Sequence, residues 1–158
     1  MQELTKDDIP DMLPLFRALH RHHVAALPEV FHDDGTDAQF AEHLAQLFDS
    51  DGAAVGVRQQ DRGLVGYALF LIQACPADVF RHAERRAYLD HLFVAQDHRR
   101  AGHAKAMISA MEDRLAAQGI ILWTASHYAF NTGVERTFAA AGARPDLVRV
   151  AKPVTGAR

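Results

Sequence analysis

The sequence predicts a mixed α/β fold, in which one sheet carries helices on both faces. Apolar residues recur at helical spacing near the start of the chain and again between residues 104 and 115. Short apolar runs typical of strands lie between these regions, and a strand–helix–strand order follows from residue 87 to residue 125. With 158 residues, 49% of them hydrophobic, residues 1–158 have the size and composition of one domain.

The first 48 residues are expected to be mostly helical. In the first helix, apolar residues follow one another at spacings of three and four: Ile9, Met12, Leu13, Phe16 and Leu19. We expect Asp7 or Asp8 to cap this helix and Pro14 to kink it. A second helix begins with the capping box Thr36-Asp37-Ala38-Gln39. Its apolar face consists of Phe40, Leu44, Leu47 and Phe48.

Strands are expected in the middle of the chain. Residues 53–57 and 64–72, separated by a turn at 60–63, are typical of an antiparallel hairpin. Pro76 and several charges predict a loop over residues 75–86, and a third strand is expected over residues 87–94.

The second half of the chain predicts a crossover between parallel strands. A long amphipathic helix ends at Gly119, and the apolar run 120–125 predicts a fourth strand beside the third. The capping box Thr132-Gly133-Val134-Glu135 predicts a short helix that ends at Gly142. Residues 147–154 are expected to form a last strand.

Charge and composition exclude several classes of protein. The net charge of -3 argues against a nucleic-acid partner, because the phosphate backbone favours a basic surface. No apolar run approaches the length of a membrane span, and the N-terminus lacks the pattern of a secretory leader. The single cysteine, Cys75, excludes an intramolecular disulfide and a multi-cysteine zinc site. A cytoplasmic protein without a membrane partner is expected.

The junction between the third strand and the long helix carries the clearest chemical signal. Residues 94–105 form a basic turn that holds Arg99 and Arg100, and small residues stand where the helix begins. A helix N-terminus has unpaired N–H groups and a partial positive charge, and small residues allow an anion to approach them closely. This junction therefore predicts a phosphate or pyrophosphate site. Its glycine spacing fits neither a Walker A loop nor a dinucleotide-binding fingerprint.

The pattern Arg99-x-x-Gly102-x-Ala104 resembles the Q/R-x-x-G-x-G/A signature of the GCN5-related N-acetyltransferases (GNAT). A later segment is similar to the asparagine-to-"FY…GF" segment of that family through Asn131, Val134, Phe138 and Gly142. The resemblance is best from residue 88 to residue 142. It implies a mostly antiparallel sheet whose two central parallel strands splay apart.

The resemblance also implies a co-substrate, acetyl-coenzyme A, and direct transfer of its acetyl group to an amine without a covalent enzyme intermediate. The pyrophosphate would bind near residues 99–105, and the pantetheine arm would pair with the strand edge at residues 92–94. The residues expected to bind the cofactor are Leu92, Phe93, Val94, Arg99, Arg100, Ala101, Gly102, His103, Ala104, Lys105, Asn131 and Phe138.

Transfer to an amine requires a base, because an amine with a pKa of about 10 is protonated at neutral pH. Asp90 is the first candidate, since strand alternation puts it on the same face as Tyr88 and Val94. Its alternative role is an ion pair with a nearby arginine. The N–H of Phe93 or Val94 is expected to donate to the oxyanion.

The acid that protonates the departing thiolate is expected to differ from the usual one of the family. The tyrosine that is frequent in the family aligns with Phe138, which has no proton to donate. Tyr128 is a candidate substitute, with a packed loop aromatic as the alternative. Phe138 also keeps open a different function, that of a non-catalytic module that binds or senses acyl-coenzyme A.

The acceptor is expected to be a small-molecule amine or a peptide N-terminus, and a homodimer is possible. His23, Phe31 and Tyr88 are the candidate acceptor-binding residues, since the segment between the first two helices commonly forms the acceptor wall in the family. A metal site at His20, His22, His23 and His32 is the competing interpretation of the histidine cluster. No metal is expected.

Overall fold

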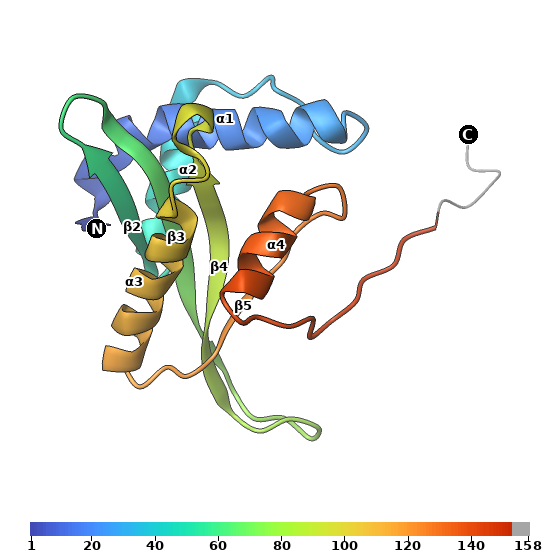
Figure 1. The fold of residues 1–158 in the computed structure, drawn as a ribbon. Helices are drawn as coiled ribbons and strands as arrows, with labels where there is room; N and C mark the ends of the chain where they lie inside the picture. The colour runs from blue at the N-terminus through green and yellow to red at the C-terminus, as the bar shows by residue number, and fades with distance from the viewer. Residues whose placement is uncertain (153–158) are drawn as a thin grey trace.

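The computed structural model describes residues 1–152 and contains one five-stranded sheet (Figure 1). The strands lie side by side in chain order: β1 (Gln2–Leu4), β2 (Gly52–Gln59), β3 (Gly63–Cys75), β4 (Glu84–Val94) and β5 (Trp123–Ala125). The first four are antiparallel, and only β4 and β5 are parallel. The mixed, mostly antiparallel sheet is thus confirmed, but among residues 1–152 its one parallel pair, β4 and β5, lies at the edge of the sheet and not at its centre.

Helices cover both faces of this sheet, as predicted (Figure 1). On one face lie α1 (Ile9–Ala26) and α2 (Asp37–Asp49), and on the other lie α3 (His103–Ala117) and α4 (Thr132–Ala140). Two 3-10 turns, η1 (Lys6–Asp8) and η2 (Gln96–His98), precede α1 and α3. The helix α3 connects β4 to β5 and makes their parallel arrangement possible.

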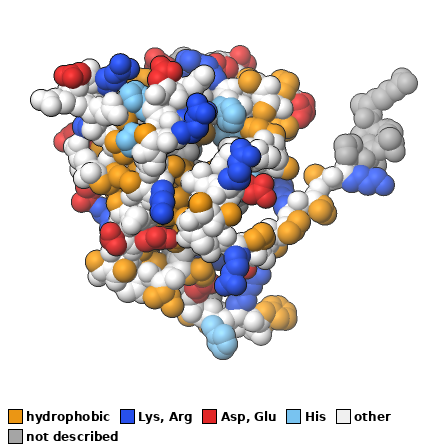
Figure 2. All heavy atoms as spheres, viewed as in Figure 1, with side chains coloured by type: hydrophobic (Ala, Val, Ile, Leu, Met, Phe, Trp, Pro, Cys, Tyr) orange, Lys and Arg blue, Asp and Glu red, His pale blue; other side chains and the backbone are white. Residues whose placement is uncertain are grey.

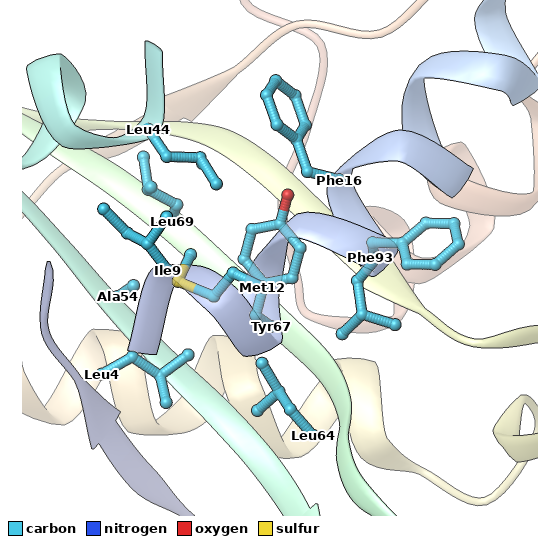
Figure 3. Close-up of a cluster of buried hydrophobic side chains, with 11 residues drawn as sticks. Leu4, Ile9, Met12, Phe16, Leu44, Ala54, Leu64, Tyr67, Leu69 and Phe93 are labelled. Atoms are coloured by element: carbon cyan, nitrogen blue, oxygen red, sulfur yellow. The ribbon is translucent and has the colours of Figure 1, made fainter. Parts of the chain in front are cut away.

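The middle of β3 separates two apolar clusters. Tyr67 and Leu69 pack under α1 and α2, whereas Ala68 and Phe70 pack under α3, and all four side chains are fully buried. Figure 3 shows the first cluster, in which Tyr67 lies beneath α1 with its hydroxyl directed toward Phe16. Each large side chain buried in this way contributes about 1.5–3 kcal/mol to stability.

The helix starts follow local sequence in part. The capping box of α2 is confirmed, since Thr36 and Gln39 exchange hydrogen bonds between side chain and backbone N–H. The predicted cap of α1 is wrong in detail, because the Asp8 side chain accepts from the backbone of Thr5 and leaves α1 uncapped. The helix α1 continues through Pro14 to Ala26.

The sheet differs from the prediction at its edges. A short β1 precedes the first helix, and β3 and β4 pair as far as Cys75 and Glu84, which shortens the predicted loop. At the other edge, β5 begins only at Trp123, because Ile121 is 96% exposed and pairs with no strand.

The strand predicted over residues 147–154 is wrong for residues 147–152, and residues 153–154 lie outside the described part of the chain. The segment after α4 extends away from the sheet (Figure 1). Figure 2 shows hydrophobic side chains along it, and Leu147, Val148 and Val150 are all more than 75% exposed. Alternating β-branched residues favour a strand, but a strand also requires a partner, and this segment has none within residues 1–152. No helix in that range is long and apolar enough for a membrane span.

Candidate active site

The site is organised by the point at which β4 and β5 separate. Their parallel pairing ends where Leu89 lies opposite Ala125. Beyond Leu89, β4 continues to Val94, paired with β3 alone among the strands of residues 1–152. The backbone of residues 90–94 therefore presents N–H and C=O groups along an open edge that faces away from β3. We call this edge the β4 opening.

A β-bulge in β4 lies at the start of this opening. Leu89 pairs with Phe70 of β3 and His91 pairs with Leu69, so Asp90 has no residue opposite to it. A bulge adds one residue to one strand and increases the local twist. Asp90 is thus the extra residue, and the bulge marks the place where β4 and β5 diverge.

The bulge reverses the alternation of side chains along β4. Leu89 before it, and Leu92 and Val94 after it, all pack toward the α3 side. Tyr88 and Val94 therefore lie on opposite faces of the sheet. The prediction that Asp90 shares a face with both is wrong, because one extra residue shifts a period of two.

Only some of the residues predicted to pair with the pantetheine arm have backbone groups that point into the β4 opening. Ala95 donates its N–H to the Val65 carbonyl of β3 at 2.9 Å, so the N–H and C=O of Phe93, two residues earlier, also point to β3. Those of Leu92 and Val94 point into the β4 opening. Of the two oxyanion donors considered, only the Val94 N–H is directed into the opening.

The N-terminus of α3 stands at the end of this opening. Gly102 is its N-cap, with a φ of 80° and no side-chain cap. The preceding Arg100 also has a positive φ, of 63°. A Cβ atom on Gly102 would meet nothing within 4 Å, so glycine is needed here for its conformation and also leaves free space above the helix. The first N–H groups of α3 face this space without a capping side chain.

Arg99 turns away from this free space. Its Nε donates to the Val94 carbonyl at 3.0 Å, and its guanidinium lies 5.5 Å from the centroid of the Phe93 ring. It lines a cavity of about 360 Å³ between α1 and the turn after β4. The other lining residues are Leu15, Ala18, Arg21, His22, Phe93, Ala95 and Gln96.

Basic groups dominate the polar wall of this cavity. Burial lowers the pKa of His22, and the neighbouring His23 and Arg99 lower it further. The Nε of Arg21 lies 3.7 Å from the Asp33 carboxylate, which partly offsets the positive charge of the arginine. The end of the cavity near Arg99 therefore favours anions.

A model of the acetyltransferase (GNAT) family matches residues 16–143. The chain belongs to the GNAT family of acetyltransferases. This match spans the β4 opening, the start of α3 and the helix α4.

Several solved structures share the fold at low sequence identity. The BH1408 protein of Bacillus halodurans, as a tetramutant, is 17% identical over 97% of this chain and 98% of its own, with a TM-score of 0.85. A ribosomal-protein-alanine N-acetyltransferase of Brucella melitensis biovar Abortus is 24% identical over 97% and 98%, with a TM-score of 0.72. An aminoglycoside acetyltransferase from an uncultured soil sample is 16% identical over 98% and 95%, with a TM-score of 0.67. No curated protein sequence matches the chain.

Three of the predicted site residues of this GNAT chain come together in an aromatic wall. The ring centroids of His23 and Phe31 are 5.4 Å apart, and Tyr128 lies 5.4 Å from Phe31 and 5.8 Å from His23. Phe130 completes the wall, 5.8 Å from His23. The wall joins the end of α1 to the loop after β5, whereas Tyr88 makes no ring contact with it among residues 1–152.

Asp90 is surrounded by histidines rather than by arginine. Its side chain is 28% exposed, and its Oδ2 lies 3.6 Å from the Nε2 of His91. Burial raises the pKa of Asp90, and the neighbouring His43 opposes this shift. The alternative of an ion pair with arginine has no support among residues 1–152.

Two predictions concern the segment around α4, namely its N-terminal cap and the environment of Phe138. Asn131, not Thr132, is the N-cap of α4, and its Oδ1 accepts from the Val134 N–H at 3.3 Å. The predicted capping box is thus wrong by one residue, and the Asn131 amide nitrogen is left to bind other groups. Phe138 packs beside Trp123, with ring centroids 5.7 Å apart, and carries no hydrogen-bonding group.

The histidines proposed as alternative metal ligands have other contacts. The Nε2 of His20 lies 2.7 Å from the carbonyl oxygen of His32, and the Nδ1 of His23 lies 2.9 Å from that of Leu19. Among residues 1–152, no three histidine, cysteine or acidic side chains are arranged to hold a metal.

Sequence reasoning missed two residues near Asp90. Tyr67 contributes a buried hydroxyl from β3, and His43 stacks on Phe16 from α2 at 5.8 Å between ring centroids. The helical spacing offered a signal for His43, since Phe40 precedes it by three and Leu47 follows by four. Nothing in the sequence separates Tyr67 from an ordinary core aromatic.

Proposed function

We propose that this protein transfers the acetyl group of acetyl-coenzyme A directly to a primary amine of a small molecule or of a peptide N-terminus. The observation that carries the proposal is the β4 opening, which leads from Asp90 to the uncapped N-terminus of α3. An extended polar chain that ends in phosphates could pair with the strand edge and place its phosphates at the helix N-terminus.

The chain has groups suited to each part of the cofactor. The N–H groups that follow Gly102, at His103, Ala104 and Lys105, would bind the pyrophosphate with help from the side chain of Arg100. Leu92 would pair with the pantetheine arm through its outward N–H and C=O groups, as an added strand does. The Val94 carbonyl already accepts from the Arg99 Nε and would have one lone pair left for the same arm. The free amide nitrogen of Asn131 would donate to the same arm.

Asp90 would act as the base for the amine. In the transfer, an N–C bond forms to the acetyl carbon and the C–S bond of the thioester breaks. The ammonium proton passes to Asp90, directly or through water, and a carboxylate with a raised pKa is a stronger acceptor for it. The Val94 N–H would donate to the acetyl oxygen as negative charge develops there.

The thiolate leaves with the electrons of the C–S bond and takes a proton, while the nitrogen of the new amide loses its second proton to water. Phe138 cannot supply that proton, and the Tyr128 hydroxyl is the proposed donor, on a side chain that is 42% exposed. His23, Phe31 and Tyr88 would contact the amine substrate, with Asp90 attracting its positive charge.

The experiment that tests the proposal measures thiol release from acetyl-coenzyme A with a panel of amines. Polyamines, amino sugars, aminoglycosides and short peptides with free N-termini cover the acceptor classes, and Cys75 adds a constant background to a thiol reagent. Amine-dependent release together with a product heavier by one acetyl group supports the proposal.

A second candidate function is a non-catalytic acyl-coenzyme A sensor, which Phe138 favours because it stands where the family frequently has a tyrosine. This function predicts binding of acetyl-coenzyme A with no acetylated product from any amine. Binding without turnover would therefore exclude the transferase and leave the sensor.

A further inference from the structure

His91 is a buried polar residue next to the proposed base, and the mechanism above does not use it. Its side chain packs against Phe16, with ring centroids 4.6 Å apart and planes inclined by 28°. The residue is only 8% exposed and is the one buried polar or charged residue of the described core. A buried imidazole must find partners for both ring nitrogens.

The Nδ1 of His91 has a hydrogen-bond partner, and its Nε2 approaches a carboxylate. Its Nδ1 lies 3.1 Å from the Tyr67 hydroxyl, and its Nε2 lies 3.6 Å from Oδ2 of Asp90. Neighbouring side chains of a regular strand point to opposite faces, so Asp90 and His91 would normally be far apart. The bulge at Asp90 removes this restriction and brings the two side chains together.

The imidazole of His91 is neutral. Burial lowers its pKa to about 3, and the neighbouring His43 and His23 act in the same direction. The Tyr67 hydroxyl keeps its proton, since burial and the charge of Asp90 raise its pKa well above 10. A neutral imidazole has one donor and one acceptor nitrogen.

These protonation states select one tautomer. If Nδ1 carried the proton, the lone pair of Nε2 would face the lone pairs of the Asp90 carboxylate whenever that group is ionised, which is repulsive. With the proton on Nε2, Tyr67 donates to Nδ1 and the Nε2–H points toward Asp90. The hydrogen bond between Tyr67 and Nδ1 is then satisfied, and the Nε2–H faces the carboxylate at 3.6 Å, which is longer than a hydrogen bond.

We propose that His91 is a positioning residue for Asp90. Held between Tyr67 and Phe16, it directs its Nε2–H at the carboxylate, fixes the carboxylate at the β4 opening and favours its charged form. The titratable groups that face this pair are Tyr67 from β3, His23 from α1 and His43 from α2. This inference rests on the proposed role of Asp90 as the base.

Nuclear magnetic resonance tests the inference without knowledge of the acceptor. In the wild-type protein, the ¹⁵N shifts of His91 should show a neutral ring protonated at Nε2 from about pH 5 to pH 8. The carboxyl ¹³C signal of Asp90 should titrate at a higher pH in His91→Phe, because the donor is lost. The matched control is His82→Phe, at an exposed position of the β3–β4 loop, which should leave the titration unchanged. A proton on Nδ1, or an unchanged Asp90 titration in His91→Phe, would overturn the inference.

Kinetics then separates this inference from the proposed function. In His91→Phe, the acid limb of kcat/KM should move to higher pH and kcat should fall about tenfold, with KM for acetyl-coenzyme A unchanged. His91→Gln keeps an N–H donor and should restore part of the loss. If His91→Phe fails to fold, Tyr67→Phe removes the hydroxyl alone and should shift the limb in the same direction.

Failure of the base role of Asp90 and failure of the positioning role of His91 give different experimental results. Should Asp90→Asn leave turnover and its pH profile unaltered, the role of Asp90 as base is wrong, whatever His91 does. Should Asp90→Asn abolish turnover while neither His91→Phe nor Tyr67→Phe moves the acid limb, the base stands and the positioning role is wrong.

Discussion

Leu89 and Ala125 are the last residues through which β4 and β5 pair. One residue later, Asp90 stands unpaired against β3 as well, so the strand changes on both of its sides at the same place. The β4 opening, which leads to the proposed cofactor site at the start of α3, and the placement of the proposed base thus have one structural cause. The bulge sets both, because it twists β4 away from β5 and reorients the side chains that follow.

The proposed cofactor site at the start of α3 is tested by Gly102→Glu. The substitution places a negative side chain in the free space above the helix, and we expect it to abolish detectable binding of acetyl-coenzyme A in calorimetry. Gly119→Glu is a matched control at the other end of α3, since Gly119 has a φ of 69° and equally open surroundings. Both variants carry similar backbone strain, of about 1–2 kcal/mol, so only a difference between them reports on the proposed cofactor site. Equal affinity in the two variants would place the phosphates elsewhere.

Asp90→Asn tests the base. We expect kcat/KM to fall by about 10²–10⁴, the usual contribution of a general base. In the wild-type protein, activity should be lost as the pH falls through the pKa of Asp90, which lies above the ordinary 3.8. The asparagine variant should lack this limb, which a pH series of initial rates would reveal. Asp61→Asn, in the exposed β2–β3 turn, is the control and should retain both rate and profile.

The same substitution has an expected effect on stability. Since folding raises the pKa of Asp90, the folded protein binds this proton more tightly than the unfolded chain does. The ionised carboxylate therefore destabilises the fold at neutral pH, and Asp90→Asn should raise the Tm at pH 7. This gain should vanish at a pH below 3.8, where the carboxyl is protonated in both states. A lower Tm of the variant at pH 7 would contradict this expectation, because it would show that neighbouring groups stabilise the ionised carboxylate of Asp90 in the folded protein.

Tyr128→Phe tests the proposed acid. We expect kcat to fall about tenfold or more while the affinity for acetyl-coenzyme A is unchanged, because only proton donation to the thiolate is lost. Introducing Phe138→Tyr in the same protein should recover part of the rate if a hydroxyl at that position reaches the sulfur. An unchanged kcat in Tyr128→Phe would leave Tyr128 with a packing role alone.

The aromatic wall is tested by Phe31→Ala. Loss of this ring removes contacts to both His23 and Tyr128, so KM for the amine should rise while KM for acetyl-coenzyme A stays constant. Phe80→Ala is the control, since Phe80 is 91% exposed at the tip of the β3–β4 hairpin. If Phe31→Ala and Phe80→Ala had the same kinetics, the wall would not contact the acceptor.

The sequence predicted the order of the main elements because hydrophobic period is a local property. The period of α1, the capping box at Thr36 and the strand–helix–strand order around α3 all depend on neighbouring residues. Residues 147–152 form no strand, although residues 147–150 favour one locally, since a strand depends on a partner that local sequence does not specify.

The turn that begins α3 could be predicted because it follows from a local sequence motif. The surroundings of Asp90 could not, because they depend on the pairing register of β3 and β4. The turn from Arg99 to Ala104 contains the uncapped helix start that the small residues indicated. The face of Asp90 was assigned wrongly because an inserted residue leaves no mark in a pattern of alternating side chains. The contact between Tyr67 and His91 links residues 24 positions apart and follows from that same register.

The central claim is that the cofactor pairs with the open edge of β4, and amide hydrogen exchange tests it most directly. The N–H groups of Leu92 and Val94 point into the opening, whereas that of Phe93 is bonded to β3. On addition of acetyl-coenzyme A, exchange at Leu92 or Val94 should slow strongly and exchange at Phe93 should change little. Slowed exchange elsewhere, with Leu92 and Val94 both unaffected, would contradict the claim.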